Sequence, residues 1–133
     1  MAKPEIVGYI PEDIWRVIHQ SVPIVCVDVA VVLGKTILML HRTTAPEAGK
    51  WWFPGGRLHR GESMPAAVHR VLKDEAGITA LGHPDLLGWE NAIYPESPYG
   101  DPNGTHTVNF VYKMTVNEFP GELRLNRFHD THI

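Results

Sequence analysis

Residues 54–78 read PGGRLHRGESMPAAVHRVLKDEAGI, and this stretch predicts the centre of the fold. Its second half is helical in pattern, because apolar side chains recur three or four positions apart. These side chains are Met64, Ala67, Val68, Val71 and Leu72. Glu75 falls inside the same apolar arc, and Gly77 follows as a C-terminal stop. A carboxylate on an apolar face is costly to bury alone, so Glu75 should have a cationic partner or a metal ion.

The segment before this helix, residues 55–62, is rich in glycine and charge. Gly55 and Gly56 permit main-chain shapes that bring carbonyl and N–H groups close to a ligand. A strand, a glycine turn, clustered charges and a helix with an inward carboxylate are typical of a metal–phosphate site. The alternative is that Glu75 only borders the arc and pairs with a nearby arginine or lysine.

The spacing of these residues resembles the Nudix box. The positions that match in register are Gly56, Glu62, Arg70, Leu72, Glu75, Gly77 and Ile78, and Asp74 replaces a glutamate conservatively. The resemblance implies an α+β fold, the Nudix α/β/α sandwich with a mixed sheet between helices. It also implies Mg²⁺, with Mn²⁺ as a substitute, and a substrate containing a nucleoside diphosphate linked to another group.

Beyond the box, residues 11–130 are similar to the GDP-mannose mannosyl hydrolase branch, which attacks the anomeric carbon and releases GDP and free sugar. By position, the resemblance implies that the Gly55 carbonyl and Glu75 hold Mg²⁺. Glu62 and Asp74 are the further metal candidates, or partners of Arg70.

The same resemblance implies roles on the substrate. Arg57 and Arg70 would stabilise the departing diphosphate, since guanidinium groups are planar and permanently charged. Arg42 would contact the nucleotide, and Asp28 and His106 would face the sugar. His129 would act as the general base on the attacking water.

Two positions depart from these patterns. Val71 stands where the Nudix box has a glutamate that often acts as general base, and valine cannot take a proton. Phe128 stands where the branch has a glutamine metal ligand. Two other functions therefore stay open: a Nudix pyrophosphohydrolase that attacks phosphorus, and a catalytically weak domain that binds a nucleotide or a protein.

Several candidates also have simpler interpretations. Arg42 and Arg57 could be surface charges, and His106 a residue at the start of a strand. His129 and His132 could suggest zinc, although no cysteine or further histidine completes such a site. Trp52, like Trp51, is interpreted as a packing residue.

The flanking sequence predicts one domain over residues 1–133, without the C-terminal helix of its relatives. Proline, acids and apolar spacing predict a helix at 11–20. Strands are predicted at 22–33, 36–42, 51–53, 81–93, 105–116 and 122–125, with the hairpin turn at 34–35 and a long exposed loop at 94–104.

The composition limits the partners. The net charge is -3 and the pI is near 6.2, which argues against a surface that attracts nucleic acid or anionic lipid. Cys26 is the sole cysteine, so we expect a reducing, cytoplasmic setting and interpret Cys26 as a core thiol. We expect a small-molecule nucleotide sugar as the partner, with neither nucleic acid nor membrane, and a homodimer is left open.

Overall fold

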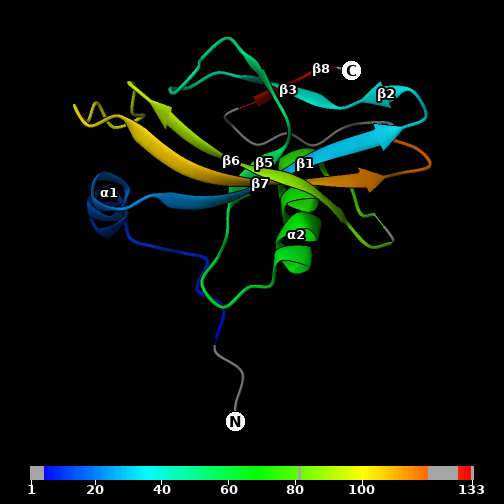
Figure 1. The fold of residues 1–133 in the computed structure, drawn as a ribbon, viewed down its shortest axis with the longest axis horizontal. Helices are drawn as coiled ribbons and strands as arrows, with labels where there is room; N and C mark the ends of the chain where they lie inside the picture. The colour runs from blue at the N-terminus through cyan, green and yellow to red at the C-terminus, as the bar shows by residue number, and fades with distance from the viewer. Residues whose placement is uncertain (1–4, 81, 120–128, 133) are drawn as a thin grey trace.

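The computed structural model describes residues 5–80 and 82–119, together with the main chain of 129–132. Figure 1 shows the helices and strands in their chain order. They are α1 (Glu12–Ser21), β1 (Ile24–Leu33), β2 (Thr36–Ile37), β3 (Met39–Arg42), β4 (Trp51–Trp52), β5 (Gly55–Arg57), α2 (Met64–Ala76), β6 (Asp85–Tyr94), β7 (Thr105–Thr115) and β8 (His129–His132).

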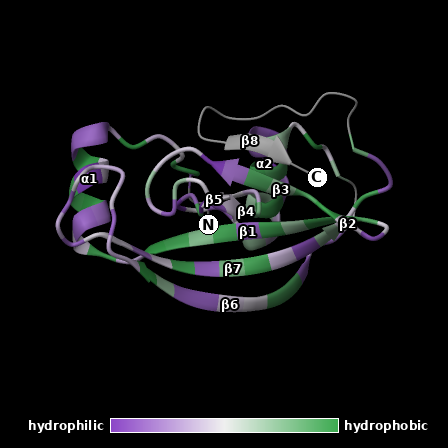
Figure 2. Ribbon diagram, turned by 90° about the horizontal axis from the view of Figure 1, so that it is seen from above, coloured by the Kyte–Doolittle hydropathy of each residue, from purple (hydrophilic) through white to green (hydrophobic). Residues whose placement is uncertain are grey.

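The larger of two sheets is mixed. Its strand order is β2-β1-β7-β6, and β5 also pairs with β1. The central pair, β1 and β7, is parallel, whereas β2, β5 and β6 pair antiparallel to their neighbours. The smaller sheet has the order β4-β3-β8. Figure 2 shows β1, β7 and β6 side by side, with apolar residues along β1 and β7. The predicted α+β class with a mixed sheet is confirmed.

Helix α2 forms where the sequence predicts it, because both of its ends are capped locally. The Ser63 hydroxyl accepts a hydrogen bond from the Ala66 N–H at 3.3 Å. At the other end Gly77 adopts φ 69°, a left-handed conformation that glycine reaches without a side-chain clash. Its N–H bonds back to the carbonyls of Leu72 and Lys73.

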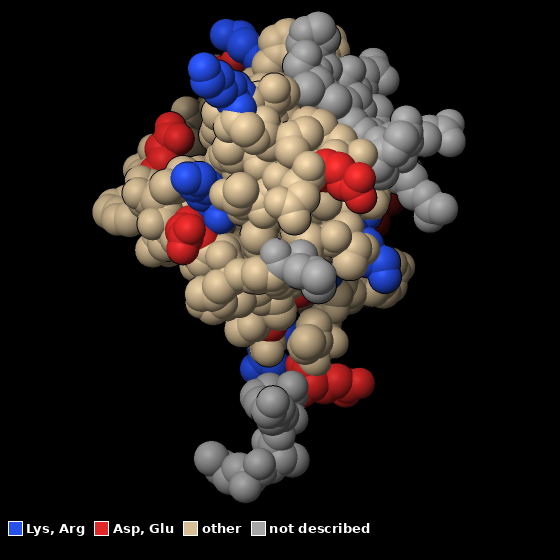
Figure 3. Space-filling view, turned by 90° about the vertical axis from the view of Figure 1, so that its right-hand side faces the viewer, with Lys and Arg blue, Asp and Glu red and all other residues tan. Residues whose placement is uncertain are grey.

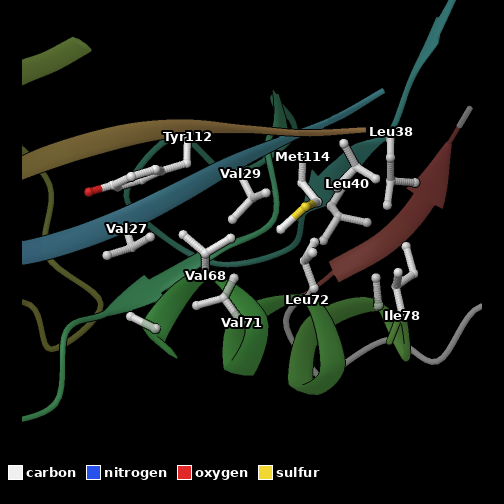
Figure 4. Close-up of a cluster of buried hydrophobic side chains, with 13 residues drawn as sticks. Val27, Val29, Leu38, Leu40, Val68, Val71, Leu72, Ile78, Tyr112 and Met114 are labelled. Atoms are coloured by element: carbon white, nitrogen blue, oxygen red, sulfur yellow. The ribbon is translucent and has the colours of Figure 1, made fainter. Parts of the chain in front are cut away.

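The core lies between α2 and the larger sheet, as Figure 4 shows. Val68, Val71 and Leu72 of α2 are at most 1% exposed, and they share one cluster with Val27 and Val29 of β1. Burying each such side chain contributes about 1.5–3 kcal/mol relative to leaving it exposed. This contact fixes α2, and with it Glu75, relative to β1.

Two predicted elements differ from the structure. The hairpin partner at 36–42 is split, because β2 pairs with β1 while β3 pairs with β4 and β8. Leu38, 0% exposed, lies at the junction and turns into the core. The predicted glycine turn is wrong as well, since Gly55–Arg57 forms β5 and pairs with β1 at positions 26–28.

The other predicted elements agree in place. Helix α1, β1, β4 and β7 lie within one or two residues of their predicted bounds, while β6 begins at Asp85, later than predicted. The short strand predicted at 122–125 lies outside the described residues.

The face of the molecule in Figure 3 carries separate acidic and basic side chains without an extended patch of one sign. In the part of the chain that the structure describes, no helix has the length and apolarity needed to cross a membrane.

Candidate functional site

A cavity of about 1070 Å³ is lined by residues of α1, β1, β5, β7 and the loop 94–104, together with Arg42 and Trp52 of the smaller sheet and Glu75 of α2. Residues of β1 and β7 alternate between the two faces, so Val27 and Val29 point to the core while Cys26 and Asp28 line the cavity. Among the predicted site residues, those that line it are Asp28, Arg42, Gly55, Arg57 and Glu75.

Asp28 is fixed between two neighbours. The Asn109 side chain donates a hydrogen bond from Nδ2 to Oδ2 at 2.8 Å. On the other side, a Cβ at Gly55 would lie 2.2 Å from Oδ1, so any larger residue there would have to displace the Asp28 carboxylate. Burial, together with the charge of Glu90, raises the pKa of the Asp28 carboxyl to about 6, despite the Asn109 bond and the charge of Arg42, which lower it.

Arg42 organises the loop that follows β3. Its Nε donates to the Pro46 carbonyl at 2.7 Å and to the Thr44 carbonyl at 3.3 Å, and Nη2 donates to the Ala45 carbonyl at 3.2 Å. Its Cζ lies 4.5 Å from the ring centroid of Trp52. All of these partners are neutral, so they orient the guanidinium without cancelling its charge.

Arg57 has the same kind of surroundings at another wall of the cavity. Nη2 donates to the Gly8 carbonyl at 2.7 Å, Nη1 donates to the Leu58 carbonyl at 3.3 Å, and Cζ lies 5.2 Å from the ring centroid of Trp15. Burial lowers the pKa of this guanidinium, and the charge of Arg70 acts in the same direction. A guanidinium nevertheless stays protonated in proteins. Arg57 therefore presents an oriented positive charge to the cavity.

Arg70 does not line the cavity. It is paired with Glu62, whose carboxylate receives Nε at 2.7 Å and Nη2 at 3.0 Å. The Asp74 carboxylate lies farther away, 3.9 Å from Nη1. Burial alone would raise the pKa of Glu62, but the hydrogen bonds from Arg70 and from the His59 N–H lower it overall. This geometry matches the sequence alternative in which Glu62 and Asp74 pair with Arg70.

The two predicted histidines have different positions. His106 does not line the cavity, although its neighbours Thr105 and Thr107 do, and its Nε2 lies 2.6 Å from Asn91 Oδ1. The main chain of His129 pairs with that of Arg42 in the smaller sheet, and its side chain is outside the description. Phe128 also lies outside the described residues.

The site can supply oxygen ligands for a metal ion. Glu75 and Asp28 line one cavity with Gly55. Burial lowers the pKa of the Arg42 guanidinium, and the charge of Glu75 opposes this shift in part. The described residues contain no group of three or more His, Cys, Asp or Glu that could hold a metal ion. Mg²⁺ does not need one, since it usually keeps several waters and binds one or two carboxylates plus substrate phosphates. The residues present therefore fit Mg²⁺ with few protein ligands.

Three further cavity residues were not predicted as part of the site. Asn109 holds Asp28, and Trp15 and Tyr99 form an aromatic wall. No local signal marks Asn109, because polar and apolar residues are equally frequent along the rest of β7. Trp15 lay in a predicted helix whose partner was unknown.

Comparisons with known proteins agree with this architecture. The family model described as the NUDIX domain matches residues 22–133. The "MutT NUDIX hydrolase" of Burkholderia pseudomallei has a crystal structure that is similar to this chain, with 34% identity and a TM-score of 0.66. The match covers 83% of this chain and 80% of that one. The predicted Nudix fold is confirmed.

Curated relatives carry several descriptions. The "Low-salt glycan biosynthesis protein Agl8" of Haloferax volcanii is 28% identical, and the match covers 82% of this chain and 69% of that protein. The "ADP-ribose pyrophosphatase" of Methanocaldococcus jannaschii is 34% identical over 77% of this chain, but over only 55% of its own length. On the family match and the fold together, this chain belongs to the Nudix domain family.

Proposed function

We propose that this protein hydrolyses a nucleoside-diphosphate sugar, GDP-mannose or a similar compound, to a nucleoside diphosphate and free sugar in the presence of Mg²⁺. The observation that carries the proposal is one cavity lined by two arginines whose hydrogen-bond acceptors are main-chain carbonyls, Arg42 and Arg57, together with the carboxylates Asp28 and Glu75. The arginines suit a diphosphate, because a guanidinium matches phosphate oxygens in charge and geometry.

The Gly55 carbonyl and the Glu75 carboxylate would hold Mg²⁺, with Asp74 and Glu62 as the less direct candidates. A bound Mg²⁺ would neutralise charge on the departing diphosphate. Arg57 would bind and orient the same group. Glu62 would first have to release Arg70, which occupies both of its oxygens.

A sugar fits the side of the cavity near Asp28. A second hollow of about 190 Å³ adjoins it and is lined in part by Asp28, Glu90, Trp52 and Tyr94. Carboxylates accept hydrogen bonds from hydroxyl groups, and aromatic rings offer apolar faces. The Haloferax relative, described as a protein of glycan biosynthesis, supports a sugar substrate. The His106 side chain would contact the sugar only if its hydrogen bond with the Asn91 side chain were broken.

The residue at position 71 favours attack at carbon. Val71, where the family motif has a glutamate, is 1% exposed within the core. It therefore supplies no base near the phosphates. We propose His129 for this role, because a neutral imidazole can accept a proton near neutral pH.

In the proposed reaction, the oxygen of water bonds to the anomeric carbon while His129 takes the proton. The bond between that carbon and the phosphate oxygen breaks, and the nucleoside diphosphate leaves with the electron pair. Hydrolysis of GDP-mannose in oxygen-18 water, followed by mass spectrometry, tests this directly. The label should appear in mannose, and GDP should stay unlabelled.

The second candidate is a pyrophosphohydrolase that attacks phosphorus. It is favoured by the Methanocaldococcus relative, whose description names ADP-ribose. The same oxygen-18 experiment on GDP-mannose and ADP-ribose separates the two, because attack at phosphorus leaves the label in a phosphate product. No turnover of any nucleotide sugar or triphosphate would favour a nucleotide-binding domain instead.

A further inference from the structure

Trp15 lies against a cavity arginine from a distant part of the sequence. Its ring faces the guanidinium of Arg57, with Cζ 5.2 Å from the centroid. An aromatic face attracts a guanidinium through its quadrupole and also restricts its rotation. Since the ring is neutral, it orients Arg57 while leaving the charge for a ligand.

Trp15 is itself held in place by the loop 94–104. Its Nε1 donates a hydrogen bond to the Tyr99 hydroxyl. The rings of Trp15 and His19 meet edge to face at 5.9 Å, and those of His19 and Tyr99 at 5.2 Å. The orientation of the indole is therefore set by both α1 and this loop.

The segment before α1 completes the support of Arg57. The Gly8 carbonyl receives Nη2 at 2.7 Å. Gly8 is in turn held close to the segment that follows β5, because the Val7 N–H donates to the Arg60 carbonyl at 3.0 Å. A Cβ at Gly8 would lie 3.1 Å from the His59 ring, so this approach is tight.

Arg42 has an equivalent arrangement, with main-chain carbonyls as acceptors and the Trp52 ring 4.5 Å away. Arg70, which does not line the cavity, is instead neutralised by Glu62. The two arginines that line the cavity are thus the ones held by carbonyls and an indole. Such support pre-orients a charge for a ligand, and pre-orientation is what stabilises a transition state.

We infer that Trp15 is a positioning residue for the reaction, which acts by holding the Arg57 guanidinium toward the diphosphate of the substrate. This inference rests on the proposed function, in which Arg57 meets that diphosphate. It adds helix α1 and residues 8–15, outside the Nudix box, to the parts of the chain that set the rate.

A double-mutant cycle on GDP-mannose hydrolysis tests the inference. Trp15→Leu should lower kcat/KM about tenfold, mainly through kcat, because Arg57 acts on charge that develops as the diphosphate leaves. Trp15→Phe keeps an aromatic face and should restore most of the loss. In the Arg57→Ala background, Trp15→Leu should have little further effect. Trp89→Leu makes the same change on β6, at a tryptophan that is 67% exposed and outside the cavity lining, and should leave kcat unchanged.

Other outcomes separate Trp15 from alternative roles. A rise in KM with kcat unchanged, equally large in the Arg57→Ala background, would mean that Trp15 contacts the substrate directly and would overturn the inference. An equal loss in Trp15→Leu and Trp15→Phe, together with a lowered melting temperature, would overturn it in favour of a purely structural role.

A binding measurement tests the inference independently of the proposed function. Calorimetric titration with GDP and Mg²⁺ should show weaker binding for Trp15→Leu than for the wild type and Trp89→Leu. The double variant Trp15→Leu/Arg57→Ala should bind GDP as tightly as Arg57→Ala alone. If the wild type binds GDP but hydrolyses no nucleotide sugar, the proposed function fails and this titration alone decides. Equal GDP affinity in Trp15→Leu and the wild type would then overturn the inference, and a wild type that binds no GDP would overturn both.

Discussion

Arg70 on α2 joins the helix to the segment after β5 through Glu62. Two of its nitrogens donate to the Glu62 carboxylate, at 2.7 and 3.0 Å, and Nη2 also donates to the Arg57 carbonyl at 2.8 Å. The Glu62 side chain is 4% exposed and that of Arg70 is 25% exposed. The contact therefore stabilises β5, which carries Arg57, and the segment that follows it, and we expect its loss to affect the fold first.

Arg70→Ala should lower the free energy of unfolding by about 3 kcal/mol, because it leaves a nearly buried carboxylate without its cation. Urea unfolding measures this change. Arg16→Ala is the control, since the Arg16–Glu12 pair has side chains that are 50% and 72% exposed and should be worth less than about 1 kcal/mol. Equal small effects for the two variants would contradict a structural role for Arg70.

Arg57→Ala should behave in the opposite way. We expect a loss of about 2–4 kcal/mol in transition-state stabilisation, seen as a fall in kcat/KM, by analogy with other pre-oriented donors. The melting temperature should change little, because the Arg57 side chain bonds to carbonyls at the edge of a cavity and not to a buried charge. Unchanged kcat/KM with a large drop in melting temperature would make Arg57 structural.

Glu75→Gln tests the metal assignment. The amide keeps the size of the side chain but removes its charge, so Mg²⁺ binding and Mg²⁺-dependent turnover should nearly vanish while the protein stays folded. Calorimetric titration with Mg²⁺ measures binding, and circular dichroism measures folding. Glu90→Gln changes a carboxylate that lines the smaller hollow but not the main cavity, and serves as the matched control for Mg²⁺ binding. A folded Glu75→Gln variant that keeps most of its rate would show that the metal lies elsewhere.

The parts of the fold that were predicted correctly have local causes. Helix α2 has its apolar stripe, the Ser63 cap and the Gly77 stop within one short segment. The split of the predicted strand at 36–42 has no such cause, because β3 does not continue along β1 but pairs with β4 and with β8, which is distant in the sequence. Local pattern could not reveal that exchange of partners.

The site residues likewise include some that could be predicted from the sequence and some that could not. Gly55 and Glu75 could be predicted from spacing within one motif, and both line the same cavity. Asn109 could not, since it meets Asp28 across a separation of 81 positions through the parallel pairing of β1 and β7. Trp15 likewise reaches Arg57 only because α1 packs beside the cavity. Residues that hold the ligand-facing groups are set by tertiary packing, which one sequence does not display.

The contribution of His19 to stability should fall at pH values below the ordinary histidine pKa. This residue is 9% exposed, and Nδ1 has no hydrogen-bond partner among the described residues. Burial lowers the pKa of His19 from its usual 6.5, and the charge of Asp101 offsets this only in part. At this residue the unfolded chain therefore binds a proton at a pH where the folded chain does not, so the His19 contribution is complete above about pH 6.5 and is lost as the pH falls below it.

His19→Phe should reduce this acid sensitivity, because phenylalanine can keep the ring contacts with Trp15 and Tyr99 but has no titrating nitrogen. Urea unfolding between about pH 5 and 7.5 should show that the variant gains stability relative to the wild type as the pH falls. The other titrating groups act on both proteins alike, since burial lowers the pKa of His59 and raises that of Asp28 to about 6. His83→Phe makes the same change at an exposed position and is the matched control. Parallel profiles for the wild type and His19→Phe would mean that His19 takes its proton as readily in the folded chain as in the unfolded one.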